Sequence, residues 1–277
     1  ISSASSICIN IYCFHKIKLK LRMLKIKPIK AFTDNYIWLV TTNEGALVID
    51  PGESKPVSDY LKKEGVYLNS ILITHHHYDH TGGLADLLNK NKDISVIGPN
   101  NHIKEIKTRV NGGDAIEVIG LTFLVISVPG HTLDHIAFYC ENDGSPILFC
   151  GDTLFAGGCG RIFEGTFDQM YKSLLKLKEL PANTKIYCAH EYTQQNLNFA
   201  NCVEPSNADI THRLKKVKEK RRHDQITLPS SIGEELKTNP FLRCDKKNIR
   251  ESIFNKYNVQ GNDTEIFEAV RNWKDAF

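Results

Sequence analysis

The chain has 277 residues, of which 41% are hydrophobic and 24% charged, enough to bury one large core or a core with a smaller second domain. The formal net charge of +3 includes +4 from the acid-free residues 1–22, so the remainder carries −1. A nearly neutral body argues against a nucleic-acid partner. No stretch approaches the about 20 apolar residues that a membrane span requires. We therefore expect no nucleic-acid or membrane partner.

The first segment differs in composition from the rest of the chain. It begins at Ile1 and is rich in Ser, Ile and Lys, whereas Met23 and the residues after it resemble the start of a protein. We predict that residues 1–22 are a disordered or non-native extension. The alternative is a targeting presequence, because the segment is basic and lacks acids.

Strands dominate the chain up to about residue 191. Residues 37–40 and 46–50 are apolar runs on either side of the turn Thr42-Asn43-Glu44-Gly45, which predicts a hairpin. Many strands with few helices fit an α/β (α+β) fold in which two sheets lie face to face with helices outside. Further strands are predicted at about 68–74, 94–98, 115–119, 121–128, 135–140, 146–150 and 184–189, and helices at about 54–64, 82–90 and 168–179.

The pattern changes at Tyr192, after which strands disappear and helical periodicity takes over. We therefore predict a catalytic domain at 23–191 and a small helical, substrate-binding domain at 192–277 that packs over the edge carrying the chemistry. Its helices are predicted at about 196–204, 207–222, 232–237 and 264–273.

Four candidate metal ligands follow one apolar strand. Residues 71–83 contain the pattern H-x-H-x-D-H at His75, His77, Asp79 and His80, and end in two glycines that open a helix. Such a strand-to-helix loop lies beyond the carboxyl edge of a sheet, where α/β folds place their active sites. The core strand and the Gly-Gly turn on either side argue against a solvated histidine run.

Three more candidates, His131, Asp152 and His190, each stand at or just past the end of another apolar run. Seven N and O donors exceed the needs of one metal and suit two divalent ions that share a carboxylate and a water. Zinc suits such donors best, and iron or manganese also fit.

The whole set of motifs resembles glyoxalase II (hydroxyacylglutathione hydrolase) of the metallo-β-lactamase superfamily, from about Met23 to the C-terminus. The resemblance implies the αββα four-layer sandwich of that superfamily with a C-terminal helical domain. The first metal motif is common to the superfamily, and the last four motifs are more specific to glyoxalase II. The motifs are Thr33-Asp34-Asn35-Tyr36, Asp50-Pro51-Gly52, Thr74 to Gly83, Gly130-His131-Thr132, Gly151-Asp152-Thr153-Leu154-Phe155, Gly158-Cys159-Gly160-Arg161, His190-Glu191-Tyr192-Thr193 and Asn239-Pro240-Phe241.

The resemblance also implies how the metal ligands divide. One ion is bound by His75, His77 and His131, the other by Asp79, His80 and His190, and Asp152 bridges the two. Two cations lower the pKa of a shared water, so the implied nucleophile is a bridging hydroxide held by Asp152 and both metals.

Other polar residues near these motifs receive different predictions. His76 points away from its neighbours on an extended backbone and is predicted not to bind metal. Asp50 and Asp134 are candidates to accept hydrogen bonds from imidazole N–H groups, the alternative being ordinary surface carboxylates. Four histidines carry no pattern and are treated as ordinary: His102, His135, His212 and His223.

The substrate contacts are likewise implied by the resemblance, which points to Arg161, Phe163, Tyr192, Arg271 and Lys274. Cations at such positions suit the two carboxylates of glutathione. For Arg271 and Lys274 the alternative is a solvated terminal helix. Arg161 stands where the family often has Lys, and Phe163 where a Tyr can occur, which removes a hydroxyl hydrogen bond.

These observations predict an enzyme that hydrolyses S-D-lactoylglutathione and other S-2-hydroxyacylglutathiones to the hydroxy acid and glutathione, in methylglyoxal detoxification. Eight scattered cysteines without a C-x-x-C pair indicate a reducing compartment, so we expect a cytoplasmic monomer. The alternative is another enzyme of this fold, such as a persulfide dioxygenase with a single iron, a lactonase or a β-lactamase. A binding module without activity is disfavoured because every expected ligand is present.

Overall fold

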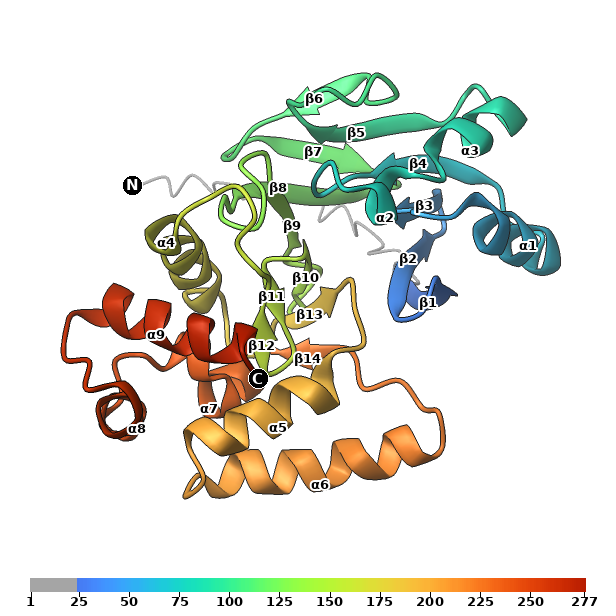
Figure 1. Ribbon diagram of the computed structural model, residues 1–277. Coiled ribbons are helices and arrows are strands. Elements are labelled where there is room, and N and C mark those ends of the chain that lie inside the picture. The colour runs from blue at the N-terminus through green and yellow to red at the C-terminus, as the bar shows by residue number, and fades with distance from the viewer. Residues whose placement is uncertain (1–23) are drawn as a thin grey trace, which may run out of the picture.

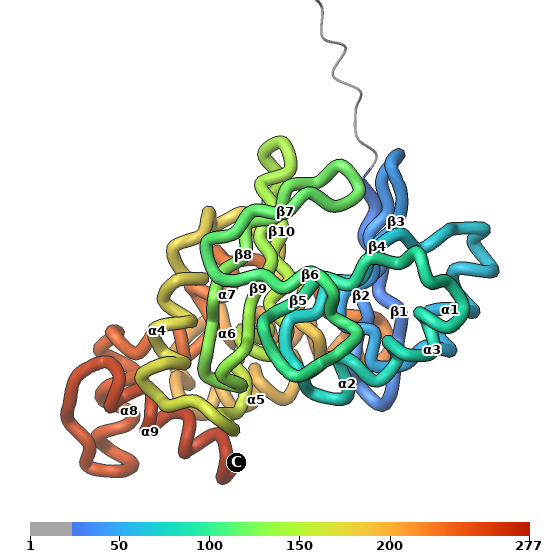
Figure 2. Tube along the Cα trace, turned by 90° about the horizontal axis from the view of Figure 1, so that it is seen from above, coloured from blue at the N-terminus to red at the C-terminus, as the bar shows by residue number. Residues whose placement is uncertain are grey.

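Two six-stranded sheets form the centre of the computed structural model, which describes residues 24–277 (Figure 1). Helices cover the outer face of each sheet, so the layers follow one another as helix, sheet, sheet and helix (Figure 2). The predicted αββα sandwich is therefore confirmed. The predicted extension at residues 1–22 lies outside the described part of the chain.

The first sheet keeps its six strands in sequence order, antiparallel from β1 to β3 and parallel from β3 to β6. The predicted hairpin is present, with Thr42 paired to Gly45 at its turn. Because β3 and β4 are parallel, the residues that follow them meet at one edge of the sheet. The strands are β1 (Lys25–Ala31), β2 (Asn35–Thr42), β3 (Gly45–Ile49), β4 (Leu68–Leu72), β5 (Ser95–Pro99) and β6 (Thr108–Val110).

The second sheet has the order β14-β13-β10-β9-β8-β7. Strand β9 is antiparallel to both β8 and β10, and β10 is parallel to β13, so β8, β10 and β13 run in the same direction. Their carboxyl ends therefore also share one edge. The strands are β7 (Ala115–Val118), β8 (Leu121–Ser127), β9 (Ile136–Cys140), β10 (Ile147–Gly151), β13 (Lys185–Cys188) and β14 (Ser230–Ser231).

The main core lies between the sheets. Alternating residues of β8, such as Phe123 and Val125, point inwards, while Thr122 and Leu124 are exposed. Phe123 meets Phe138 of β9 edge-on with ring centroids 6.5 Å apart. Every residue of β9 and β10 is buried, because elements pack on both faces of the second sheet here.

Helices α1 and α3 cover the first sheet, where Val57 and Leu87 pack with Ile71. Helix α4 covers the second sheet through Met170 and Leu174. It starts where the sequence favours a start, because Thr166 and the side chain three residues later form a reciprocal capping box. The helices are α1 (Ser54–Glu64), α3 (Leu84–Lys90) and α4 (Phe167–Lys178).

Beyond residue 191 the chain is mostly helical and lies beside the second sheet (Figure 1). One cluster of buried side chains extends from that sheet into this region and includes Phe199, Phe241 and Phe267. The proposed division at residues 191 and 192 stays a prediction. The elements are α5 (Thr193–Val203), α6 (Ala208–Arg222), α7 (Ile232–Thr238), the 3-10 helix η1 (Pro240–Leu242), α8 (Lys247–Tyr257) and α9 (Asp263–Asp275).

The expectation that strands disappear after Tyr192 was wrong at one place, the two-residue strand β14, which pairs with β13. Its two serines have no apolar alternation, and the extended conformation follows from pairing with a neighbour distant in sequence. Strands β1 and β6 and helix α8 were also not predicted. Within residues 24–277, no helix combines the length and apolar character needed to cross a bilayer.

Candidate metal centre and substrate cavity

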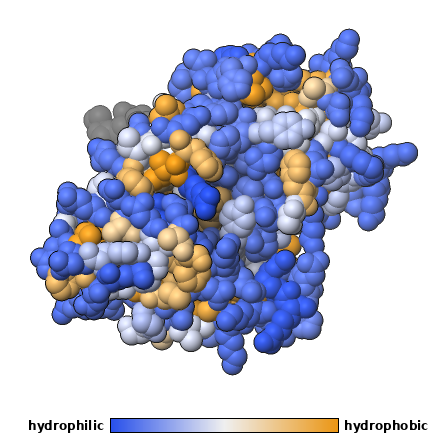
Figure 3. Space-filling view, in the orientation of Figure 1, coloured by the Kyte–Doolittle hydropathy of each residue, from blue (hydrophilic) through white to orange (hydrophobic). Residues whose placement is uncertain are grey.

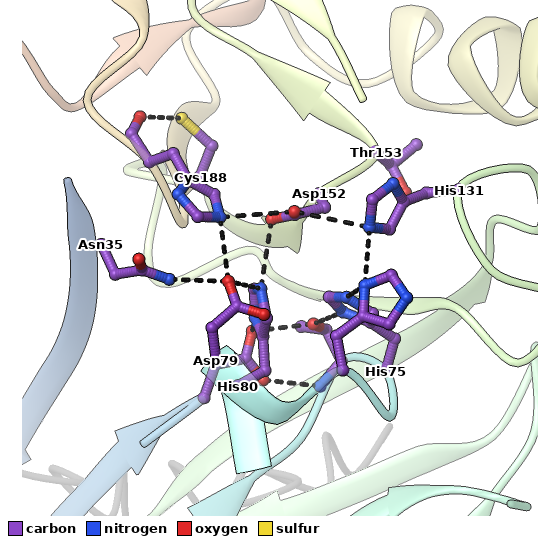
Figure 4. Close-up of polar contacts among 12 residues, drawn as sticks. Asn35, His75, Asp79, His80, His131, Asp152, Thr153 and Cys188 are labelled. Atoms are coloured by element: carbon purple, nitrogen blue, oxygen red, sulfur yellow. Dashed lines mark hydrogen bonds and ion pairs between the residues drawn. The ribbon is translucent and has the colours of Figure 1, made fainter. Parts of the chain in front are cut away.

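The seven predicted metal ligands come from the facing edges of the two sheets. Helix α2 (Tyr78–Thr81) follows the end of β4 and carries Asp79 and His80, while His75 and His77 precede it. The other three follow strands β8, β10 and β13 of the second sheet. Figure 4 shows the two sets meeting, with Asp152 between the imidazoles.

Donor atoms gather into groups that match the two predicted sites. Atoms of His75, His77 and His131 lie within 4.8 Å of one another, and so do atoms of Asp79, His80 and His190. In the first group His77 Nδ1 lies 3.1 Å from His75 Nε2 and 3.0 Å from His131 Nε2. In the second, Asp79 Oδ2 lies 3.4 Å from His80 Nε2 and 3.5 Å from His190 Nε2.

Asp152, for which a bridging role was predicted, stands between the groups. Its Oδ1 lies 3.4 Å from His80 Nε2, and its Oδ2 lies 3.5 Å from His131 Nε2 and 3.3 Å from His190 Nε2. Donors 3.0–3.5 Å apart can share one ion at the about 2.0–2.2 Å typical of zinc ligands.

The chemistry of the cluster fits bound cations. His80 Nε2 and Asp152 Oδ1 are buried and face each other at 3.4 Å, but neither has a hydrogen-bond partner, a costly arrangement unless a cation satisfies both. Burial also holds the pKa of His75 well below its usual value, so this imidazole is neutral and keeps a lone pair for a metal. Although burial opposes it, the His190 and His80 imidazoles hold the pKa of Asp152 well below its usual range.

Outer partners fix the direction of three imidazoles. His80 Nδ1 donates to Asp50 Oδ2 at 3.0 Å, and His131 Nδ1 donates to a backbone carbonyl, Arg161 O, at 2.7 Å. His190 Nδ1 lies 2.7 Å from Asp34 Oδ1. Each contact leaves Nε2 turned towards the centre, the arrangement typical of histidines that bind metals.

The two carboxylates predicted to accept from imidazole N–H groups, Asp50 and Asp134, contact different histidines. Asp50 contacts His80, which belongs to the cluster. Asp134 Oδ1 instead lies 2.9 Å from Nδ1 of His76, whose Nε2 lies 3.3 Å from Glu164 Oε1. Both ring nitrogens of His76 thus face carboxylates outside the seven donors, and its exclusion from the ligand set stays a prediction.

His135 was predicted to have no special role, but it contacts two of the predicted metal ligands, Asp152 and His75. Its Nε2 accepts the backbone N–H of Asp152 at 3.1 Å, and its ring stacks on His75 with centroids 4.5 Å apart. Burial, then nearby His131, lowers its pKa to about 3, so the ring is neutral and can accept this bond. Asp34 belongs to the motif Thr33-Asp34-Asn35-Tyr36, but no role was predicted for it. Its contact with His190 joins residues far apart in the chain and arises only in the folded structure.

The five predicted substrate contacts line one cavity that opens on the metal centre. Its volume is about 410 Å³, and His131 and Asp152 form part of its wall. The Tyr192 ring stacks on His190 with centroids 4.7 Å apart, and the exposed Phe163 ring lies edge-on, 5.2 Å from His131. The predicted contacts in this wall are Arg161, Phe163, Tyr192, Arg271 and Lys274.

The alternative interpretation of Arg271 and Lys274, both on α9, was a solvated terminal helix, and neither side chain is fully solvated. Arg271 is only 4% exposed, and it donates to Cys159 O and to Asp275 Oδ1, both at 2.9 Å. Lys274 is half-buried, and burial, then the neighbouring Arg271, lowers its pKa to about 8. Its Nζ lies 5.3 Å from the ring centroids of Phe199 and Phe277.

The surface drawn in Figure 3 is hydrophilic over much of its area, and apolar side chains gather there in separate small patches.

Comparison with known proteins places the chain in a family. The family described as "Hydroxyacylglutathione hydrolase C-terminus" matches residues 191–277, and the one described as "Metallo-beta-lactamase superfamily" matches residues 32–190. Similar relatives include a hydroxyacylglutathione hydrolase of Pseudoalteromonas translucida, 49% identical, which covers 92% of this chain and 100% of the relative. One from Pseudomonas aeruginosa is 47% identical with the same two coverages.

Solved structures share the fold at lower sequence identity. ETHE1 from Myxococcus xanthus has a TM-score of 0.60 at 23% identity, covering 92% of this chain and 99% of its own. The BLEG-1 B3 metallo-beta-lactamase has a TM-score of 0.58 at 21% identity, covering 79% and 99%. Identity near one half over nearly the full length of the relatives, together with both family matches, shows that the chain belongs to the hydroxyacylglutathione hydrolases of the metallo-β-lactamase superfamily.

Proposed function

We propose that this chain hydrolyses the thioester bond of S-D-lactoylglutathione and related S-2-hydroxyacylglutathiones, with D-lactate or another hydroxy acid and glutathione as products. The observation that carries the proposal is the juxtaposition of two features. A cluster of seven candidate metal ligands opens directly into a cavity whose wall holds Arg161, Arg271 and Lys274.

The donor set would hold two divalent ions, for which we propose zinc, with iron or manganese as the alternatives. His75, His77 and His131 would hold one ion, Asp79, His80 and His190 the other, and Asp152 would contact both. Two such ions supply a lowered pKa for a shared water and polarisation of the substrate carbonyl.

The residues of the cavity would orient the substrate. Arg161 and Lys274 are placed to bind the carboxylates of glutathione, which lie far from the reacting carbonyl. Arg161 is 62% exposed on its side chain, and its Nε lies 3.3 Å from Asp275 Oδ1, so it can turn towards an incoming carboxylate. Phe163 and Tyr192 flank the route from these cations to the metal centre.

The leaving group needs little assistance from the chain. By analogy with cysteine, a thiol has a pKa of about 8.5, so glutathione can depart as a thiolate near neutral pH. Because water is the proposed nucleophile, a serine or cysteine nucleophile is not required. We further propose that the enzyme acts as a cytoplasmic monomer in methylglyoxal detoxification.

The test is thiol release from S-D-lactoylglutathione by the purified protein, before and after chelation and after metal is added back. We expect release that stops with the chelator and returns with metal. If a sample holds two metals per chain and still releases no thiol, the proposed metal centre stands and the glutathione thioester is rejected as the substrate.

A further inference from the structure

A short hairpin connects the metal centre to the substrate cavity. Strands β11 (Leu154–Phe155) and β12 (Gly158–Cys159) follow directly after Asp152 and pair with each other alone. The hairpin then returns to its start, since Gly160 N donates to Thr153 O at 3.2 Å. A Cβ at Gly160 would lie 1.9 Å from Asp152 O, so only glycine fits there.

The outward side of the hairpin forms part of the cavity. The Phe155 ring meets His190 and Tyr192 edge-on, with centroids 5.8 Å and 5.3 Å apart. The carbonyl of Cys159 accepts the hydrogen bond from Arg271. A small displacement of this hairpin would therefore shift both an aromatic wall and a basic side chain of the cavity.

The opposite side of the hairpin is held by residues from the C-terminal part of the chain. Asn239 Nδ2 donates to Phe155 O at 3.2 Å and to Gly158 O at 2.9 Å. Glu235 Oε2 accepts the backbone N–H of Gly157 at 2.7 Å. Figure 1 shows these strands between the second sheet and helices α5 and α7.

This attachment is itself rigid. Glu235 and Asn239 are both 0% exposed, and Asn239 Nδ2 also lies 2.9 Å from Glu235 Oε2. The other carboxylate oxygen of Glu235 accepts from Arg213 Nη2 at 2.6 Å and from the hydroxyl of Ser230. A buried carboxylate with this many donors has little freedom to move, because releasing any of them leaves a buried polar group unpaired.

We propose that Asn239 and Glu235 are positioning residues, which hold the β11–β12 hairpin as a wall of the cavity and thereby set the affinity for the glutathione part of the substrate. The inference rests on the proposed thioesterase function. The metal centre has its own support, because His135 holds the backbone N–H of Asp152 independently of this attachment. Loosening the hairpin should therefore weaken substrate binding more than metal binding.

The central variant is Asn239→Ala, which removes both hydrogen bonds to the hairpin carbonyls. We expect KM for S-D-lactoylglutathione to rise about tenfold, kcat to stay within about twofold, and metal content to remain at two per chain. The matched control is Arg250→Ala, another side chain of this region that donates to a loop carbonyl, Gly261 O, at 2.7 Å. Its hydrogen bonds do not reach the hairpin, so KM should not change.

Two measurements that need no turnover separate this proposal from the thioesterase proposal. Amide exchange at Gly157 should accelerate in Asn239→Ala and not in Arg250→Ala, and the Kd for glutathione should rise about tenfold by calorimetry. If Asn239→Ala does not fold, the same measurements are made on Asn239→Ser, which leaves a smaller cavity.

An inactive wild type would reject the thioesterase function, and exchange and calorimetry would still decide the role of the hairpin. Unchanged KM and Kd in the Asn239 variant, or equal changes in the Arg250 control, would overturn the positioning role even if the hairpin exchanges faster.

Discussion

Asp152 is the predicted bridge between the two groups of candidate ligands, because its two oxygens face histidines of different groups. We predict that Asp152→Ala loses both metals. Loss of a partner outside the ligand set typically costs about 10- to 100-fold in metal affinity or activity, and a bridging ligand should cost more. Elemental analysis and thiol release measure the effect, with His212→Ala on α6 as a control. Near-normal activity with two metals bound would contradict the bridging role.

We predict that Lys274 makes substrate binding depend on pH. Its pKa of about 8 means that the ammonium group is present below this pH and lost above it. If the ammonium binds a glutathione carboxylate, KM should be low below pH 8 and rise by about tenfold above it, with kcat less affected.

The check is a KM profile from about pH 6.5 to 9.5 for wild type and Lys274→Arg, because arginine stays charged throughout. The arginine variant should lose the rise. A wild-type KM that is flat across this range would remove Lys274 from the binding assignment.

At the residue scale, the sequence marks the candidate donors but not the residues that contact them from outside the cluster. The seven candidate ligands are marked by their place directly after apolar strands, which is a local signal. The support from His135 and Asp34 depends on which strand ends become neighbours, as in the stacking of His135 on His75. The ligand and substrate-contact assignments themselves stay predictions, although the fold brings each set together.

At the scale of elements, the turns that follow the strands pack directly against one another. Gly52, in the turn after β3, lies against α2, and a Cβ there would stand 1.9 Å from the backbone oxygen of Asp79. This contact accounts for the glycine of the Asp50-Pro51-Gly52 motif, because any larger residue must displace the helix that carries Asp79 and His80.

We predict that Gly52→Ala costs about 1–3 kcal/mol of stability through overpacking and lowers the metal content of the second group. The control is Gly144→Ala, where no heavy atom lies within 4 Å and φ is +83°. That control should lose about 1–2 kcal/mol from backbone strain and keep its metals. Thermal unfolding with metal analysis distinguishes the two, and full metal occupancy in Gly52→Ala would refute the contact argument.

Elements with strong local signals were predicted well, and those that depend on neighbours were not. Helix α1 spans the predicted residues 54–64, since an apolar face and a glycine after its end mark both limits. Strand β14 has two serines and becomes a strand only by pairing with β13. Helix α8 has few buried positions, Ile249 and Ile253, and its apolar periodicity is correspondingly weak.

At the scale of the whole molecule, the metal centre lies where the two sheets face each other. The first sheet supplies His75, His77, Asp79 and His80, and the second sheet supplies the other three donors. Bound ions would therefore connect the two halves of the sandwich, and metal binding becomes part of the folding free energy. We predict that chelation lowers Tm by at least about 8 °C, since one site at 1,000 times its Kd contributes about 4 kcal/mol.

The chelated protein should also depend on pH in a defined direction. Without ions, burial opposes protonation of His190, but Asp152 and Asp34 raise its pKa to about 9. The unfolded value is about 6.5. A raised pKa stabilises the fold fully below the unfolded value, and this contribution is lost as pH rises through about 9. The Tm of the chelated protein should therefore fall between about pH 6.5 and 9.

Metal-loaded protein should not show this fall, because bound ions take the place of the imidazole proton in neutralising the carboxylates of the centre. The lowered pKa of His75 keeps that imidazole neutral throughout the window, so it does not mask the effect. Thermal unfolding at several pH values, with and without chelator, provides the comparison. Equal Tm values with and without metal at pH 7 would mean that the ions do not connect the sheets. A chelated protein that becomes more stable towards pH 9 would contradict the raised pKa of His190.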